Sequence, residues 1–289
     1  MVLALRSDDR LFMWAGGKNR LIPHYEAIFP EDVRVRPYVE PFAGGAAIFN
    51  HIVQPEGRGS ILSDVNQEIV DLYRLVKSNP DFLINRMAEH EAEWLPLSGA
   101  GRKALYYRLR EEYWSMKEGH EATALLYFLM KTGFNGIWQT CKASKGRYGT
   151  PVGLANQREG VFRPDVVRSW SRKLANTDLR CCSYSEIEIP MGAFVFCDPP
   201  YRESFTKYGT NFGDDDQIKL IEWCREVSER TGSVVWLCNR EAGDGFFERH
   251  AGDAEIHRFP ITYTAGRRKA THDGYKAKSA TEILMVWSP

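Results

Sequence analysis

The stretch AFVFCDPPY, residues 193–201, joins a run of apolar residues to an acid, two prolines and a tyrosine. An apolar run of this length that ends at turn residues is typical of a strand buried inside a sheet. Proline fixes φ and lacks an N–H, so we expect the strand to end at Asp198 and a rigid loop to follow. Asp198, Pro199 and Tyr201 are therefore predicted at the carboxyl edge of a sheet, where α/β proteins bind their ligands.

Short apolar runs of the same kind recur along the chain and predict seven strands. They cover residues 37–40, 60–63, 179–182, 193–197, 233–238, 255–259 and 281–287. Helical patterns lie between several of them, for example at residues 66–77 and 215–230. This alternation predicts an α/β fold in which helices cover both faces of one sheet.

Residues 79–173 interrupt the alternation, because they contain helical patterns and no convincing strand. Residues 102–117 carry apolar side chains at helical spacing, and residues 121–131 are apolar all round, as in a buried helix. We predict a helical insert at 79–173, carried by a sheet domain that comprises residues 1–78 and 174–289.

The charges of the 289-residue chain balance overall, with 38 basic and 38 acidic residues, but they are unevenly distributed. Residues 131–173 contain nine Lys and Arg against two acids, a local net charge of +7. Four apolar or aromatic residues lie among them: Phe134, Ile137, Trp138 and Tyr148. Such a stretch can contact phosphates and wedge bases apart, although a solvated loop is the alternative. A second basic patch at residues 267–278 fits a DNA clamp or plain solvation equally well.

Several classes of protein and site are disfavoured by composition. No apolar run approaches the ~20 residues that cross a bilayer, and the apolar stretch at the N-terminus is too short for a signal peptide. The six cysteines show no C-x-x-C spacing and the seven histidines are scattered. We therefore expect a cytoplasmic protein with reduced thiols and no metal.

Two more acids follow predicted strands. Residues 40–45 read EPFAGG, so Glu40 ends a strand and a glycine turn follows it. Glycines at this place let the backbone approach a nucleotide-like ligand closely. Asp64 ends the next strand, where a carboxylate can accept hydrogen bonds from both hydroxyls of a ribose. The alternative for this second acid is a helix N-cap, which Asp64 or Asn66 could supply.

The loop after Cys197 suits one reaction, the alkylation of an exocyclic amine on a heteroaromatic base. Such an amine is a poor nucleophile because its lone pair is delocalised into the ring. The Asp198 carboxylate and the Pro199 carbonyl can accept its two N–H bonds and favour a localised lone pair, while Tyr201 stacks on the base. A rigid proline turn with a capping acid is the alternative.

Five segments, taken in order, resemble the Dam-type family of DNA adenine methyltransferases. They are WAGGK at 14–18, EPFAGG at 40–45, SDVN at 63–66, GFNG at 133–136 and DPPY at 198–201, and the resemblance spans about residues 12–287. It implies a Rossmann-like methyltransferase sheet with a helical DNA-recognition insert. It also implies methyl transfer from S-adenosylmethionine to N6 of an adenine flipped out of duplex DNA, without a metal. We expect a monomer, with a dimer on DNA as the alternative.

The resemblance assigns roles to matching positions. The catalytic motif corresponds to Asp198, Pro199 and Tyr201. The cofactor-binding positions correspond to Trp14, Gly17, Lys18, Glu40, Phe42, Gly44, Asp64 and Asp198, with Lys18 expected to neutralise the methionyl carboxylate. The DNA-binding positions correspond to Phe134, Asn135, Ile137, Gln139, Lys142, Lys145, Arg147 and Tyr148. Asn239 matches a polar residue that follows a strand in the family, without an assigned role.

The chain departs from the family pattern at two places. Residues 180–184 read RCCSY and lack the acid that often lies near the cofactor adenine. Gln139 occupies the position at which members that methylate GATC carry a guanine-reading arginine, and glutamine prefers adenine. The target is therefore expected to differ from GATC. Methylation of cytosine N4, methylation of RNA and a DNA-binding protein without catalysis remain the alternatives.

Overall fold

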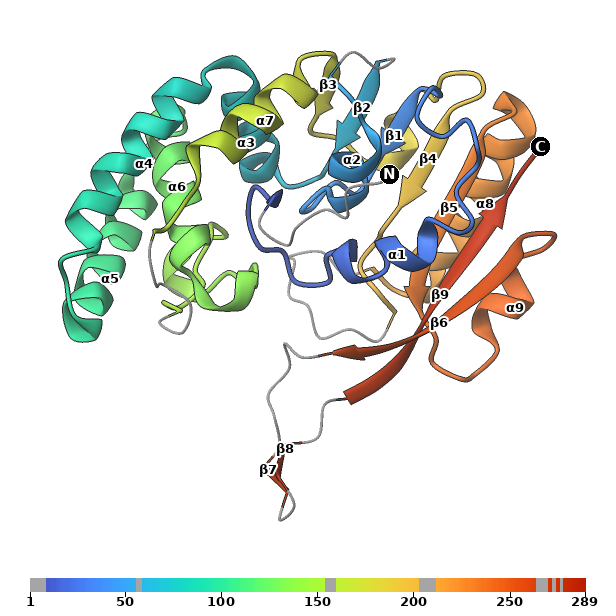
Figure 1. Ribbon diagram of the computed structural model, residues 1–289. Helices are drawn as coiled ribbons and strands as arrows, with labels where there is room; N and C mark the ends of the chain where they lie inside the picture. The colour runs from blue at the N-terminus through green and yellow to red at the C-terminus, as the bar shows by residue number, and fades with distance from the viewer. Residues whose placement is uncertain are drawn as a thin grey trace.

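The computed structural model describes residues 9–55, 59–153, 160–202, 212–263, 270–271, 274–275 and 278–289, with no side chains described between 262 and 279. A seven-stranded sheet forms its centre, in the order β3-β2-β1-β4-β5-β9-β6 (Figure 1). Its strands are β1 (Tyr38–Glu40), β2 (Ser60–Ser63), β3 (Thr177–Arg180), β4 (Phe194–Cys197), β5 (Val234–Arg240), β6 (Glu255–Tyr263) and β9 (Lys278–Trp287). The predicted Rossmann-like sheet of about seven strands is confirmed.

The strand order places two loops side by side at one edge of the sheet. β3, β2, β1, β4 and β5 run parallel, whereas β9 is antiparallel to both β5 and β6. The chain leaves β1 towards β2 and later returns to β4 on the other side of β1. The loops after β1 and β4 therefore diverge at a topological switch point, the usual ligand site of such sheets.

The described part of the chain contains nine α-helices. They are α1 (Ile22–Tyr25), α2 (Ala47–Ile52), α3 (Gln67–Ser78), α4 (Pro80–Trp94), α5 (Gly99–Ser115), α6 (His120–Thr132), α7 (Pro164–Leu174), α8 (Asp214–Thr231) and α9 (Phe246–His250). Of these, α4, α5 and α6 lie in the insert beside the sheet (Figure 1). The helices α4 and α7 are among those that were not predicted individually. Each begins with a proline in its first turn, where the missing N–H costs nothing. None of the described helices is long and apolar enough to cross a membrane.

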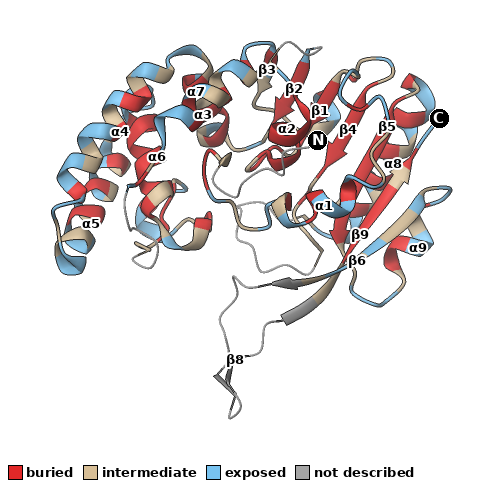
Figure 2. Ribbon diagram, in the orientation of Figure 1, coloured by how far each residue is buried: buried red, intermediate tan, exposed pale blue. Residues whose placement is uncertain are grey.

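The strands alternate their side chains between two hydrophobic layers. Phe194 and Phe196 of β4 join the layer that contains α2 and α3, whereas Val195 and Cys197 join the layer of α8. Both layers are buried along the central strands, as Figure 2 shows. This period of two determines which polar residues at the edge of the sheet face one another.

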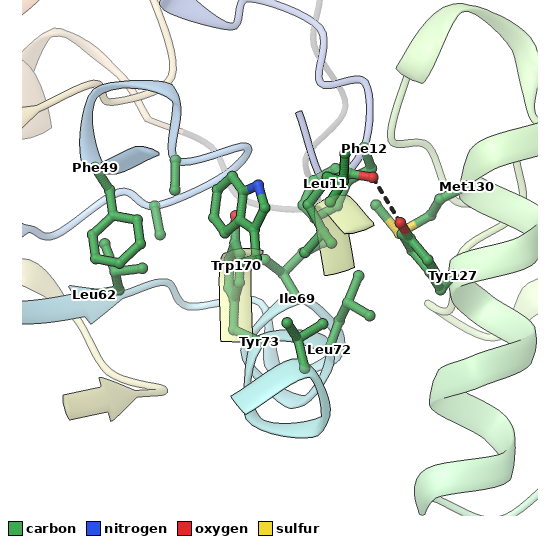
Figure 3. Packing of buried hydrophobic residues seen from close by; sticks show 14 of the residues in the cluster. Leu11, Phe12, Phe49, Leu62, Ile69, Leu72, Tyr73, Tyr127, Met130 and Trp170 are labelled. Atoms are coloured by element: carbon green, nitrogen blue, oxygen red, sulfur yellow. Dashed lines mark hydrogen bonds between the residues drawn. The ribbon is translucent and has the colours of Figure 1, made fainter. Parts of the chain in front are cut away.

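The core extends from the sheet into the helical insert. Trp170 of α7 stacks on Tyr73 of α3 at 5.8 Å between ring centroids and also packs on Phe49 of α2. The Tyr127 hydroxyl of α6 donates to the Leu11 carbonyl at 2.8 Å (Figure 3). The insert is thus packed on the sheet domain through α3, and the N-terminal segment runs between the two.

Two small strands, β7 (Ala270–Thr271) and β8 (Gly274–Tyr275), pair with each other between β6 and β9, which form a long hairpin that projects from the sheet (Figure 1). The side chains of the second basic patch, Arg267, Arg268, Lys269, Lys276 and Lys278, lie outside the described residues, as does Arg158.

Candidate active site

Four strands place polar side chains at the carboxyl edge of the sheet. Glu40 ends β1, Asp198 follows β4 and Cys238 lies near the end of β5. Glu282 lies near the start of β9, which reaches the same edge because it runs in the opposite direction. On their strands, Glu40, Cys238 and Glu282 take positions on the face of the sheet that α2 and α3 cover. The alternation of side chains therefore gathers several ionisable groups in one place.

Lys18 lies at the centre of this group. It belongs to the short 3₁₀ helix η2 (Lys18–Arg20) and its side chain is 3% exposed. Its ammonium lies 2.6 Å from both carboxylate oxygens of Asp198 and donates to the Gly16 carbonyl at 2.8 Å. Burial opposes the charge more than any single group favours it, but Asp198, Cys238 and Glu282 together outweigh burial and raise the pKa of Lys18. Lys18 therefore stays charged and holds Asp198 in place.

Asp198 is itself shifted towards its protonated form. Burial raises the pKa of its carboxyl group, and the Lys18 ammonium opposes that shift. The Cys238 thiol lies 3.3 Å from Oδ1. A buried carboxylate that one ammonium orients is well suited to accept an N–H and then a proton.

Glu40 forms the floor of the site. Its Oε2 accepts hydrogen bonds from the Tyr38 hydroxyl at 2.7 Å and from the Phe49 N–H at 3.2 Å. Burial, reinforced by the nearby Asp198, raises the pKa of Glu40 to about 8 although the Tyr38 bond opposes it. Glu40 is therefore mostly protonated at neutral pH.

The glycine turn after Glu40 is fixed from two sides. Asp64 accepts the Gly44 N–H through Oδ2 and the Asn66 N–H through Oδ1, both at 2.9 Å. A Cβ on Gly44 would lie 2.6 Å from Nε1 of Trp14, so the glycine makes room for that indole. The helix N-cap is Asn66, which accepts from the first turn of α3. Asp64 thus ties the turn to the end of β2.

A cavity opens between these groups. Its volume is about 420 Å³ including the open solvent at its mouth. Seven of the eight predicted cofactor residues line it, namely Trp14, Gly17, Lys18, Glu40, Phe42, Gly44 and Asp198. Asp64 is not among them, and Arg10 and Phe12, which the sequence did not suggest, are. Segments 180 residues apart therefore build one pocket.

The loop that carries Tyr201 is held by two buried amide side chains. Gln217 of α8 donates to the Pro200 carbonyl at 2.9 Å, and Asn239 of β5 accepts the Arg202 N–H at 3.1 Å. The two amides join at 3.0 Å, and both are fully buried. Asn239 thereby acquires a role, and Gln217 is a residue that sequence reasoning missed. Its only signal was a glutamine in the first turn of the helix that follows the motif.

The turn at residues 134–136 lies against the N-terminal segment of the pocket. Gly136, at φ +63°, accepts the Ala15 N–H at 3.0 Å, and a Cβ there would lie 2.6 Å from that of Met13. The Trp138 and Trp14 rings lie 5.9 Å apart. The predicted DNA-binding turn is therefore in direct contact with the segment that lines the cavity.

Several predicted DNA contacts do lie at the surface. Phe134 is 46% exposed, Lys142 and Lys145 are exposed, and Asn135, Ile137 and Gln139 are partly exposed. The loop that carries them is closed at its base, where the Gly149 N–H donates to the Gln139 carbonyl at 2.8 Å. A loop with a rigid base and an exposed basic tip is suited to binding a negatively charged surface.

Other members of the predicted DNA-binding set are used inside the protein, which corrects the sequence interpretation. Tyr148 is 1% exposed and packs on Trp138, so it supports the loop and presents no surface to DNA. Arg147 pairs with Glu68 at 3.2 Å, and its guanidinium lies 3.9 Å from the centroid of the Tyr113 ring. Burial lowers the pKa of Lys131 and of Lys173 to about 8. The local charge of +7 therefore overstates what DNA would meet.

Comparisons with known proteins identify the family of this chain. A family model described as D12 class N6 adenine-specific DNA methyltransferase matches residues 14–258. The chain is 29% identical to the type II methyltransferase M.MjaIII of Methanocaldococcus jannaschii, over 94% of this chain and 96% of that one. It is 26% identical to the DNA adenine methylase of Escherichia coli K12, over 99% and 97%. The retron Ec67 DNA adenine methylase of Escherichia coli is also 26% identical, over 96% and 90%. The chain belongs to the D12 class of N6 adenine-specific DNA methyltransferases.

Proposed function

We propose that this methyltransferase binds S-adenosylmethionine in the 420 Å³ cavity and methylates N6 of an adenine flipped out of duplex DNA. The observation that carries the proposal is the position of Asp198. Its carboxylate lines the cavity and also begins the loop that presents Pro199 and Tyr201. A group in this place can contact the methyl donor and the acceptor amine together.

The residues around the cavity fit a cationic ligand with an aromatic base. Glu40 and Asp198 supply carboxyl groups to its interior, and Phe42 supplies a flat apolar surface. When bound, S-adenosylmethionine supplies a sulfonium methyl group, whose C–S bond breaks as the bond to N6 forms and whose electron pair stays on sulfur. Lys18 lines the cavity while it holds Asp198, so its charge also favours an anionic group there.

The chain's own groups prepare the amine. Asp198 accepts one N–H of the target amine and the Pro199 carbonyl accepts the other, which favours a localised lone pair on N6. As N6 becomes positively charged it loses a proton, which Asp198 takes up. Burial raises the pKa of Asp198 and makes it a better proton acceptor than an exposed carboxylate. Positioning of both reactants supplies most of the catalysis.

The insert at 79–173 is proposed to read the DNA, with residues 1–78 and 174–289 as the catalytic domain. Phe134, Gln139, Lys142 and Lys145 lie on the exposed loop beside the cavity. Flipping a base costs a few kcal/mol of unstacking, and Tyr201 replaces part of the lost stacking. We propose a monomer that acts in the cytoplasm, where bacterial DNA lies.

Methylation of unmethylated DNA of mixed sequence tests the proposal. The protein is incubated with this DNA and methyl-labelled S-adenosylmethionine, the nucleosides are separated, and the labelled sites are mapped. We expect N6-methyladenine at one short motif that differs from GATC. Label in N4-methylcytosine, or none in DNA, would refute the assignment.

A further inference from the structure

Glu282 is a carboxylate in a place that an apolar residue would be expected to fill. It is 3% exposed, and the next residues of β9, Ile283, Leu284 and Met285, are fully buried. A buried carboxylate costs stability unless it is well paired, and an apolar residue of similar volume is often the more stable choice. The position of Glu282 therefore calls for an explanation other than core packing.

A hydrogen-bond partner of Glu282 belongs to the catalytic motif. The Tyr201 hydroxyl donates a hydrogen bond to Oε2 of Glu282. β9 lies beside β5 in the sheet, with Glu282 opposite Arg240, so the carboxylate approaches the Asp-Pro-Pro-Tyr loop from the sheet and not from the loop itself. A hydrogen bond to an ionised acceptor is about twice as strong as one between neutral groups.

Two cations lie near the Tyr201 ring. The Lys18 ammonium lies 4.7 Å and the Arg240 guanidinium carbon 5.8 Å from the ring centroid. Hydrogen bonding of the hydroxyl to a carboxylate raises electron density in the ring, which strengthens its attraction for cations. The target amine becomes positively charged during methyl transfer, so this polarisation acts where charge develops.

We propose that Glu282 is a positioning residue for methyl transfer, which fixes the Tyr201 ring against the target base and polarises it. The proposal rests on the proposed stacking role of Tyr201. Glu282 acts through the tyrosine and does not itself reach the reacting atoms. It deepens the assignment of the site, because neither the motif nor the cavity lining includes this residue.

Four variants test the contact from both of its ends: Glu282→Gln, Glu282→Ala, Tyr201→Phe and the double variant Tyr201→Phe/Glu282→Gln. Glu255→Gln is the matched control, because Glu255 lies in the same sheet and its side chain is 72% exposed. For each protein we measure the single-turnover rate with enzyme in excess over duplex carrying the mapped site. The cofactor Kd and the melting temperature are measured in parallel.

We expect Glu282→Gln and Tyr201→Phe each to slow the single turnover by about tenfold, and Glu282→Ala to slow it more, because a charge-assisted bond is lost. The cofactor Kd should change by less than about twofold. The double variant should be no more than about twofold slower than the slower single variant, since both changes remove one contact. Glu255→Gln should turn over at the wild-type rate.

A wild-type rate in Glu282→Gln, or effects that multiply in the double variant, would overturn the proposal. If Glu282→Ala folds poorly, Tyr201→Phe still removes the same contact without changing β9. Tyr201→Ala distinguishes the stacking role of Tyr201 from the positioning role of Glu282. A wild-type rate in this variant contradicts the stacking role itself. A slow Tyr201→Ala with a normal Glu282→Gln contradicts only the role of Glu282.

Discussion

Replacing Asn239 by alanine should separate the position of the catalytic loop from the binding of cofactor. The substitution removes the hydrogen bonds to the backbone N–H of Arg202 and to the Gln217 side chain, the second of which is fully buried. Gln217 then loses its fixed orientation towards the Pro200 carbonyl. The loop then loses its support on both sides of Tyr201, at Pro200 and at Arg202, whereas no residue that lines the cavity is changed.

The structure gives the size of the effect. Each of the two lost hydrogen bonds is worth about 1 kcal/mol, and a buried amide left without a partner costs about 1–3 kcal/mol more, so we expect a loss of about 3–5 kcal/mol in the free energy of unfolding. For a chain of this size that corresponds to a melting temperature lower by roughly 6–20 °C. A displacement of about 1 Å in the loop would slow single turnover by about 100-fold.

Thermal unfolding followed by circular dichroism, single-turnover kinetics and cofactor titration measure the three quantities. Asn176→Ala is the control, since Asn176 is exposed and its side-chain amide donates to the Pro55 carbonyl at 3.4 Å. We expect that control to behave like the wild type. If Asn239→Ala melts early but turns over at the wild-type rate well below its melting temperature, the amide pair is structural only and the reasoning is refuted.

Four further substitutions give separate outcomes. Asp198→Ala should abolish methyl transfer in a filter assay and leave duplex affinity within about threefold, because Asp198 lies in the pocket and not on the DNA-facing loop. Because the pKa of Glu40 is about 8 in place of 4.5, the native state binds more protons than the unfolded state between these pH values. Urea unfolding should therefore show that the stability of the wild type falls relative to that of Glu40→Gln as the pH rises from about 5 to 8. A constant difference between the two proteins would contradict this. Lys142→Ala combined with Lys145→Ala should lower the slope of log affinity against log salt by about two, one for each exposed lysine. Gln139→Arg should alter the mapped methylation motif, and an unchanged motif would remove Gln139 from the set of base-reading residues.

Much of the fold could be predicted because local pattern and tertiary role coincide in the strands. Phe194 to Cys197 read as a buried strand and are one, and the loop after them lies at the expected edge. The third strand was predicted at residues 179–182, but β3 begins at Thr177. Thr177 pairs with Ser60 in the sheet, and because it is polar it lies outside the apolar pattern. Patterns of hydrophobicity locate an element better than they locate its ends.

The site was harder to predict wherever a role depends on partners distant in sequence. Tyr148 and Arg147 resemble DNA contacts in a basic loop, and only packing reveals that the first is buried and the second paired with Glu68. Gln217 and Glu282 are ordinary residues in their own elements. Gln217 contacts the catalytic loop from the start of α8, and Glu282 reaches it only through the order of strands β4, β5 and β9. A short motif identifies the reacting groups, whereas the groups that hold them come from elsewhere in the sheet.

The balance of charge acquires a physical meaning once these positions are known. Under the proposed function the protein binds a cationic methyl donor and a polyanionic duplex within a short distance of each other. Carboxyl groups of Glu40 and Asp198 face the cavity, while Lys142 and Lys145 lie on the exposed loop connected to it. Lys18 neutralises Asp198 from within the protein, so the pocket repels approaching phosphates less. The exposed lysines can therefore attract the duplex while the cavity presents a protonated Glu40 and an Asp198 already paired with Lys18, so the protein needs no net positive charge to bind DNA.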